Sequence, residues 1–302
     1  MKIFQFFLLP LVLTCAFTSV KAQNQTGLDS TGLPGDNFSL QGALHLFQMS
    51  TSPEDFEKQL NTESNNVNNL DLNGDNDIDY VRVIDKSDKN SHVLILQVPI
   101  SSTESQDIAV IEIEKTGDTT AILQIIGDED IYGEEVIVEP DVSGDSPTNG
   151  YKGGAPMENY DNASGVIVFN VWYWPSVRFI YAPVYRPWVS PWQWRSYPVW
   201  WRPWRPMGWH VWHPFYSRYH RSYAIVHTNR VIHAHKLYAP VRTHSVIVRT
   251  RHAGAIGNYH ITHTKTYVKG PRGHTATVKH TTVKGPRGKV KATKTTVRKG
   301  KH

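Results

Sequence analysis

Cysteine is almost absent from this chain of 302 residues, in which Cys15 is the only one. Cys15 lies within the first 22 residues, and if that segment is removed no disulfide can form. Stability must then come from an apolar core or from bound metal ions. The sequence also lacks a nucleophile elbow, a phosphate-binding glycine loop, a His-Glu zinc helix and a recognisable pair of catalytic carboxylates, so nothing in it indicates an enzyme.

Acidic residues are absent from the whole second half of the chain. All 27 lie between Asp29 and Asp161, whereas 24 of the 32 Lys and Arg residues and 13 of the 15 His residues follow Asn162. The formal charge of +5 therefore hides two segments of opposite sign. This asymmetry indicates an acidic folded unit joined to a polybasic interaction segment.

Residues 1–22 have the layout of a cleavable secretory signal, with Lys2, a short apolar stretch and small residues before a cut after Ala22. The apolar stretch is shorter than the about 20 residues that span a bilayer, which argues against a permanent anchor. We therefore predict export to the periplasm or the cell surface, with no transmembrane segment in the mature chain. Lipid attachment at Cys15 is the alternative, although residues 12–14 lack the small residue usual before such a cysteine.

Residues 23–35 are predicted to be a flexible leader and residues 36–140 a small acidic α+β domain. Asp36 can cap a first helix, and Ser52-Pro53 is a strong start for a second. Beyond Asn65, short runs rich in Val and Ile are too closely spaced for helical crossovers, which predicts an antiparallel β-meander with both helices packed on it. The predicted strands cover residues 80–84, 93–98, 108–114, 121–126 and 136–138.

The sharpest motif is the run Asp-Leu-Asn-Gly-Asp-Asn-Asp-Ile-Asp at 71–79. It resembles the calcium loops of dockerin and EF-hand modules and, more closely, those of FG-GAP-type hairpin repeats. Ca²⁺ prefers six to eight hard oxygens, which alternate positions of a tight loop can supply. Asn76 replaces the usual turn glycine and Arg82 replaces the bidentate Glu of an EF-hand, so a turn that binds no ion stays open as the alternative. The ligands implied by the resemblance are the side chains of Asp71, Asn73, Asp75 and Asp79 and the carbonyl of Asp77.

Residues 141–165 are predicted to be a linker, and residues 166–240 form a region that holds all ten Trp residues, interleaved with Pro, Arg and His. Frequent Pro favours an extended backbone, although residues 166–174 and 177–181 can also pair as a hairpin or lengthen the sheet. In composition the region resembles indolicidin-like membrane-active peptides, in which Trp lies at the lipid boundary and Arg pairs with phosphate. The same side chains can stack on cell-wall sugars or unpaired bases, or pack over the sheet. The residues expected to face a binding surface are Trp188, Trp192, Trp194, Trp200, Trp201, Arg202, Trp204 and Arg205.

Residues 241–302 contain a repeat. Val-Lys-Gly-Pro-Arg-Gly at 268–273 returns at 283–288, and a decayed copy ends at residue 300. Such polar repeats cannot bury a face, which predicts a disordered basic tail. A cluster formed by Asp128, Glu129, Asp130, Glu134, Glu135 and Glu139 is predicted to be a salt-sensitive docking surface for this tail, a site for a divalent ion, or a solvated edge.

Three His pairs in the second half have spacings that can chelate Zn²⁺ or Cu²⁺: His210 with His213, His233 with His235, and His260 with His263. Because that half contains no Cys and no carboxylate, a surface that gains positive charge near pH 6.5 is the preferred interpretation.

Together these patterns predict an exported, non-enzymatic protein that binds anionic envelope lipid or cell-wall polymer through its second half. The build resembles exported bacterial proteins of unknown function, which implies no activity. The main alternative is a structural or assembly role, in which the basic tail pairs with the acidic domain of its own or a neighbouring chain. Export disfavours nucleic acid as a partner, and a metal-dependent hydrolase is favoured least. The sequence leaves the oligomeric state open.

Overall fold

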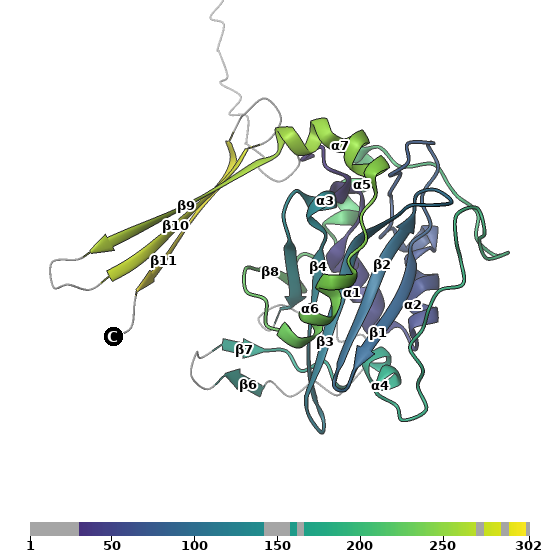
Figure 1. Cartoon of the computed structure of the whole chain (residues 1–302), viewed down its shortest axis with the longest axis horizontal. Coiled ribbons are helices and arrows are strands. Elements are labelled where there is room, and N and C mark those ends of the chain that lie inside the picture. The colour runs from purple at the N-terminus through teal and green to yellow at the C-terminus, as the bar shows by residue number, and fades with distance from the viewer. Residues whose placement is uncertain (1–29, 142–157, 162–165, 270–274, 285–289, 300–302) are drawn as a thin grey trace, which may run out of the picture.

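A computed structural model describes residues 30–141, 158–161, 166–269, 275–284 and 290–299. Its centre is a six-stranded antiparallel sheet with the order β1-β2-β3-β4-β5-β8 and helices on both faces (Figure 1). The predicted α+β class and antiparallel sheet are confirmed, whereas the predicted signal peptide lies outside the described residues. The six strands are β1 Arg82–Asp88, β2 Ser91–Pro99, β3 Ser105–Gly117, β4 Thr120–Gly127, β5 Val136–Pro140 and β8 Tyr223–Val226.

The first long helix, α1 Leu40–Met49, is capped by Ser39, whose side chain accepts a hydrogen bond of 3.0 Å from the Gly42 amide. The predicted cap, Asp36, lies instead in the 3-10 helix η1 Pro34–Asn37. There its carboxylate accepts hydrogen bonds from the hydroxyls of Ser30 and Thr31. Both residues are typical caps, and Ser39 takes the role because it directly precedes the apolar periodic stretch.

The second helix, α2 Pro53–Leu60, begins as predicted, with Ser52 accepting from the Asp55 amide at 3.1 Å and Pro53 in the first turn. It lies with α1 on one face of the sheet, and Phe47 and Phe56 meet edge to face in that core. A short turn, η2 Glu63–Asn65, follows α2.

Helix α4 Pro175–Ile180 packs beside α1 on this same face (Figure 1). A hairpin or an extra strand was predicted here, and the structure differs because Pro175 opens a helix. Its fixed φ and missing amide hydrogen suit the first helical position. The nearest strand, β7 Val166–Val168, pairs with β6 Glu158–Asp161 in a separate two-stranded ribbon.

The opposite face of the sheet is covered by helix α6 Ile232–Tyr238, which crosses β1, β2 and β3 (Figure 1). Ala234 and Tyr238 are buried there in a second cluster with Val93 and Ile95. Residues that follow the acidic domain in sequence therefore supply one of its layers.

Both edges of the sheet are also completed by the second half of the chain. Strand β8 pairs with β5, and at the other edge the Asp85 amide donates to the Trp188 carbonyl at 2.7 Å and the Ser190 amide donates to the Val83 carbonyl at 3.1 Å. Exposed strand edges are templates for aggregation, so this pairing protects the sheet. The domain predicted to end at residue 140 thus extends well into the aromatic region.

The chain beyond residue 240 also differs from the predicted disorder. Helix α7 Val246–Asn258 is capped by Ser245, whose hydroxyl accepts from the Val248 amide at 3.2 Å. Three paired strands then project from the body (Figure 1), and the Gly-Pro-Arg-Gly part of each repeat lies outside the described residues. Alternating Thr and Val residues favour strands, and each strand here finds its partner in the next. These strands are β9 His260–Lys269, β10 Thr275–Lys284 and β11 Val290–Lys299.

Three shorter elements complete the described fold: α3 Glu129–Tyr132, α5 Trp209–Tyr216 and η3 Ala239–Val241. Within the described ranges, no helix combines the length and the apolar character needed to span a bilayer.

The aromatic region contributes Trp212 on α5 to the core, where the side chain is 0 % exposed and its Nε1 donates to the Asp36 carbonyl at 2.8 Å. We expect Trp212→Ala to lower the free energy of unfolding by about 3–5 kcal/mol, because it leaves a cavity and an unpaired carbonyl. Val211, 59 % exposed, is the matched control, and Val211→Ala should cost less than about 0.5 kcal/mol. Urea denaturation showing equal costs would mean that the second half is not part of the folding unit.

Candidate functional site

The eight residues predicted to face a binding surface do not share one surface. Trp201 is buried, only 3 % exposed, and meets Tyr80 edge to face with 5.1 Å between ring centroids. This is a correction, since a Trp packed in this way cannot contact a partner. Trp200 is 46 % exposed, and Arg202 and Arg205 are also exposed. The remaining four, Trp188, Trp192, Trp194 and Trp204, are half-buried.

Glu57 on α2 anchors the aromatic region to the sheet. One carboxylate oxygen accepts from the hydroxyls of Tyr80 and Ser190 at 2.8 and 2.9 Å, and the other accepts from the Val83 amide at 2.8 Å and from Trp188 Nε1 at 3.2 Å. Burial raises the pKa of Glu57, and the four donors oppose that shift. Because both oxygens already accept two hydrogen bonds, Glu57 holds Trp188 in place and has no free position for a substrate.

Two adjoining cavities open beside Trp188, and we call them the first and second lobes of an aromatic groove. The first lobe has a volume of about 290 Å³ and the second of about 260 Å³, and Ser52, Glu54 and Trp188 line both. Sequence reasoning missed this groove because its walls come from α2 and from a segment more than 100 residues later. The first lobe adds Pro53, Phe179, Ala182, Val184, Tyr185 and Arg186, and the second adds Asp55, Glu57, Lys58, Tyr80, Trp192 and Trp200.

The acidic loop at 71–79 folds around its first side chain. The Asp71 carboxylate accepts from the amides of Gly74, Asp75 and Asn76 at 2.7, 3.1 and 3.0 Å. Gly74 and Asn76 have left-handed backbones, with φ of 74° and 65°, which these two residue types tolerate best. Asn76 therefore replaces a turn glycine without disrupting the loop.

The loop does not assemble a metal-binding set as it stands. Asp79 is buried, and burial first, then the charges of Asp71 and Asp75, raise its pKa to about 8. However, across the described ranges no group of three or more His, Cys, Asp or Glu side chains is placed to hold a metal ion. The carboxylate oxygens of Asp71 and Asp75, which would be calcium ligands, accept hydrogen bonds from amides of the loop itself. Calcium binding therefore stays a prediction.

The two motifs singled out in the sequence meet in space. The Ile78 amide donates to the Trp204 carbonyl at 2.9 Å, and Arg205 Nη1 donates to the Asn76 carbonyl at 2.9 Å. Arg205 also lies 3.6 Å from the Asp77 carboxylate, with both side chains largely exposed. The Trp/Arg segment therefore lies against the acidic loop.

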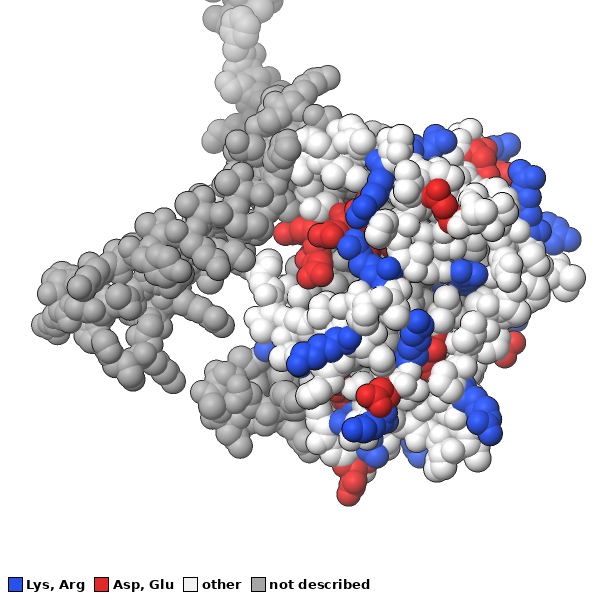
Figure 2. Space-filling model, in the orientation of Figure 1, with Lys and Arg blue, Asp and Glu red and all other residues white. Residues whose placement is uncertain are grey.

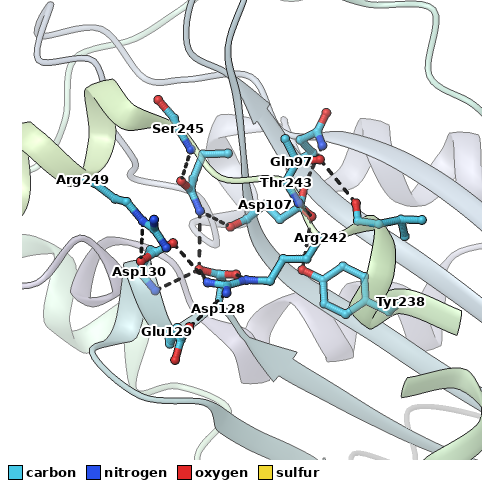
Figure 3. Close-up of polar contacts among 12 residues, drawn as sticks. Gln97, Asp107, Asp128, Glu129, Asp130, Tyr238, Arg242, Thr243, Ser245 and Arg249 are labelled. Atoms are coloured by element: carbon cyan, nitrogen blue, oxygen red, sulfur yellow. Dashed lines mark hydrogen bonds and ion pairs between the residues drawn. The ribbon is translucent and has the colours of Figure 1, made fainter. Parts of the chain in front are cut away.

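The acidic cluster at the start of α3 binds Arg242 and Arg249 from the second half of the chain (Figure 3). Arg242 forms a bidentate pair with Asp128 at 2.6 and 3.0 Å and contacts Glu129 and Asp130 at 2.9 and 3.1 Å. Arg249 Nε lies 3.0 Å from Asp130. Bidentate pairing to a buried carboxylate is the geometry in which such a contact stabilises most. Of the three alternatives for this cluster, the contacts of Arg242 and Arg249 match docking of the basic segment.

The pair His233 and His235 contacts carboxylates of β3 beneath α6. His235 Nδ1 lies 2.9 Å from Glu112 and His233 Nδ1 lies 3.2 Å from Glu114. Glu112 is fully buried and its Oε2 has no hydrogen-bond partner. Burial raises the pKa of Glu112 to about 7, although the charge of His235 opposes the shift. Each His thus has its own carboxylate. The other pairs are not brought together on carboxylates: His213 packs against Trp209, and the side chains of His260 and His263 lie outside the described residues.

We expect calcium to raise the melting temperature of the whole chain if the acidic loop binds it. At a hundred times Kd the added stability would be about 3 kcal/mol. Asp75→Asn should remove the shift, whereas Asp77→Asn should keep it, because the resemblance assigns only the carbonyl of Asp77. No shift in the unmodified protein with millimolar CaCl₂, by differential scanning fluorimetry, would rule the site out.

Glu112 should make the protein more stable as the pH falls. Its pKa is higher when folded than when unfolded, so the folded state binds the proton more tightly and gains stability from about pH 7 down to about pH 4.5. Glu112→Gln should remove this part of the pH dependence, on the order of 2 kcal/mol. Urea unfolding of both proteins at intervals between pH 8 and pH 5 measures the difference, and parallel curves would contradict the expectation.

No protein-family model matches the chain, and no curated protein or solved structure matches it either. Its function is therefore inferred from its own residues.

Proposed function

We propose that this is an exported, non-enzymatic protein that binds an anionic lipid or polymer of the cell envelope through the arginines of its second half. The supporting observation is how the charges divide between interior and surface. Buried acids do not contribute to the surface potential as exposed ones do, so the surface is more basic than the composition suggests. The buried acidic residues are Asp36, Glu57, Asp79, Asp85, Asp107, Glu112, Glu114 and Asp128.

Unlike these acidic residues, the basic residues lie at the surface. Within the described part of the chain no Lys or Arg is buried, and Figure 2 shows their side chains spread across one face of the body. Arg pairs bidentately with phosphate and carboxylate, which suits anionic lipids and acidic polymers. Exposed residues of this kind in the second half include Arg186, Arg195, Arg202, Arg205, Arg218, Arg221, Lys236 and Arg251.

Exposed apolar groups accompany these arginines in the segment around Arg202. Val199 is 90 % exposed and Trp200 is 46 % exposed, and both lie close in sequence to Arg202 and Arg205. A Trp ring beside guanidinium groups can enter the boundary between headgroups and acyl chains, or stack on a sugar ring. This segment is our candidate for the first contact with an envelope surface.

A structural role is the second candidate, and the ion pairs of Arg242 and Arg249 favour it. These residues stabilise the chain's own acidic cluster, so they are not free for a partner. If that were the whole purpose of the basic half, high salt without any ligand would loosen the C-terminal segment and added polymer would have no effect. Limited proteolysis at low and high salt distinguishes the two.

We expect the mature protein to cosediment with anionic vesicles or cell-wall polymer at low salt and to be released as salt rises. Arg202→Gln with Arg205→Gln should weaken binding about ten- to thirty-fold, since each basic residue near an anionic surface contributes about 1 kcal/mol. Lys89→Asn is the control, because Lys89 is an exposed base in the first half, and Asn tolerates its left-handed φ of 51°.

Three outcomes would contradict the proposal: no binding to either anionic material at low salt, binding to DNA alone, or equal losses in the control and the double variant. Zwitterionic vesicles separate electrostatic attraction from simple apolar insertion. Comparing vesicles with polymer identifies which source supplies the anion.

A further inference from the structure

The aromatic groove is lined by carboxylates, whereas the residues proposed to bind the envelope are arginines. Glu54 lies between the two lobes, is exposed, and has no hydrogen-bond or ion-pair partner among the described residues. Asp55 accepts from the Thr51 amide at 2.9 Å, and Glu57 is fully engaged. Glu54 is therefore the carboxylate of the groove that is free to pair with a ligand.

The second lobe already has a cation against an aromatic ring. Lys58 Nζ lies 5.8 Å from the ring centroid of Trp200, and Trp188 and Trp192 also line the lobe. The faces of Trp rings attract cations most strongly among the aromatic side chains. The lining of this lobe contains three carboxylates, those of Glu54, Asp55 and Glu57, and one ammonium, that of Lys58. The excess of negative charge suits a positively charged group.

The first lobe has a different character. Phe179, Val184, Tyr185 and Trp188 make it mainly apolar, and Arg186 there disfavours a second cation. A compact apolar ring fits such a lobe better than a charge does. The whole groove thus suits an extended ligand with an apolar ring next to a positive charge.

The chain itself carries this chemistry twice. Lys-Gly-Pro-Arg-Gly occurs at 269–273 and again at 284–288, with the proline directly before an arginine and no acidic residue nearby. Proline rings pack well against Trp and Tyr, which is how aromatic grooves recognise proline-containing peptides. We propose that the groove binds the Lys-Gly-Pro-Arg-Gly repeats of a second copy, with Pro in the first lobe and Arg beside Glu54 and the Trp rings of the second.

A second copy is the appropriate source because of where the elements lie. Strands β9–β11, which flank the repeats, project from the body on the side away from α2, which carries Glu54 (Figure 1). The groove and the strands that flank the repeats are different parts of the chain, so the contact is heterologous and can link many copies in a row. Two repeats in each chain raise the effective concentration of the second binding event.

The first test is calorimetric titration of the whole protein with a synthetic peptide of residues 266–273. Glu54→Gln should weaken binding about three- to ten-fold, because it removes the free carboxylate. Glu63→Gln, at an exposed acid on η2 outside the groove, is the matched control and should change nothing. Peptides with Pro271→Ala or Arg272→Gln should each bind more weakly.

Lys58→Met should strengthen peptide binding, whereas Glu54→Gln should weaken it. Removing the resident ammonium frees Trp200 for the ligand, so the peptide should bind about two- to five-fold more tightly. An anionic ligand in the same lobe would instead bind more weakly to this variant. No binding of the peptide, equal binding by the Glu54→Gln variant, or weaker binding by the Lys58→Met variant would each overturn the proposal.

This inference does not rest on envelope binding, and the two can fail separately. The peptide titration contains no polyanion, and the Arg205→Gln variant, changed outside the groove, should bind the peptide as the parent does. In the full chain, sedimentation velocity at low salt should show association that depends on concentration and that Glu54→Gln reduces. A protein that stays monomeric at the highest concentration would refute linkage between copies.

Discussion

Buried carboxylates need hydrogen-bond donors, and in this protein the second half of the chain supplies donors to six of the eight buried ones. Asp107 accepts from the Thr243 amide at 2.8 Å and from the Tyr238 hydroxyl at 3.2 Å, and Arg242 pairs with Asp128. A carboxylate buried without such partners costs several kcal/mol. Packing of the second half against the acidic meander therefore stabilises these carboxylates in the folded chain. The division of charge seen in the sequence is thus a division between two interlocking parts of one fold.

The same constraint shapes the surface and the groove. Because eight acidic residues turn inward to meet their donors while no described Lys or Arg is buried, the surface is more basic than the composition suggests. Glu57 is the clearest case, since its four donors fix Trp188 at the sheet edge. Trp188 then forms the wall shared by both lobes. An interaction needed for stability thereby creates a concave aromatic site next to a free carboxylate, Glu54.

Predictions from the sequence succeeded where the signal is local. Ser52 and Pro53 begin α2 because capping and a fixed φ act within one turn. The Val- and Ile-rich runs became strands, and their short spacing required antiparallel pairing. Predictions were wrong where two local signals competed. Ser39 rather than Asp36 caps α1, and Pro175 begins a helix inside a stretch whose apolar residues also suit a strand.

By itself the sequence determined the fold class, the five-strand meander and the separation of charge, and it left docking on the cluster at Asp128 as one of three alternatives. Each of these follows from residue spacing, structural propensity or the sign of charge, which can be read from short stretches of sequence. Only the tertiary structure decided that Trp201 is buried, that β8 and α6 complete the acidic domain, and that Glu54 lies in an aromatic groove. These features depend on contacts between residues far apart in the sequence, such as that of Glu57 with Ser190, which are 133 residues apart. No local sequence pattern encodes such a contact, because many partners are equally compatible and only the packing of the whole fold selects one.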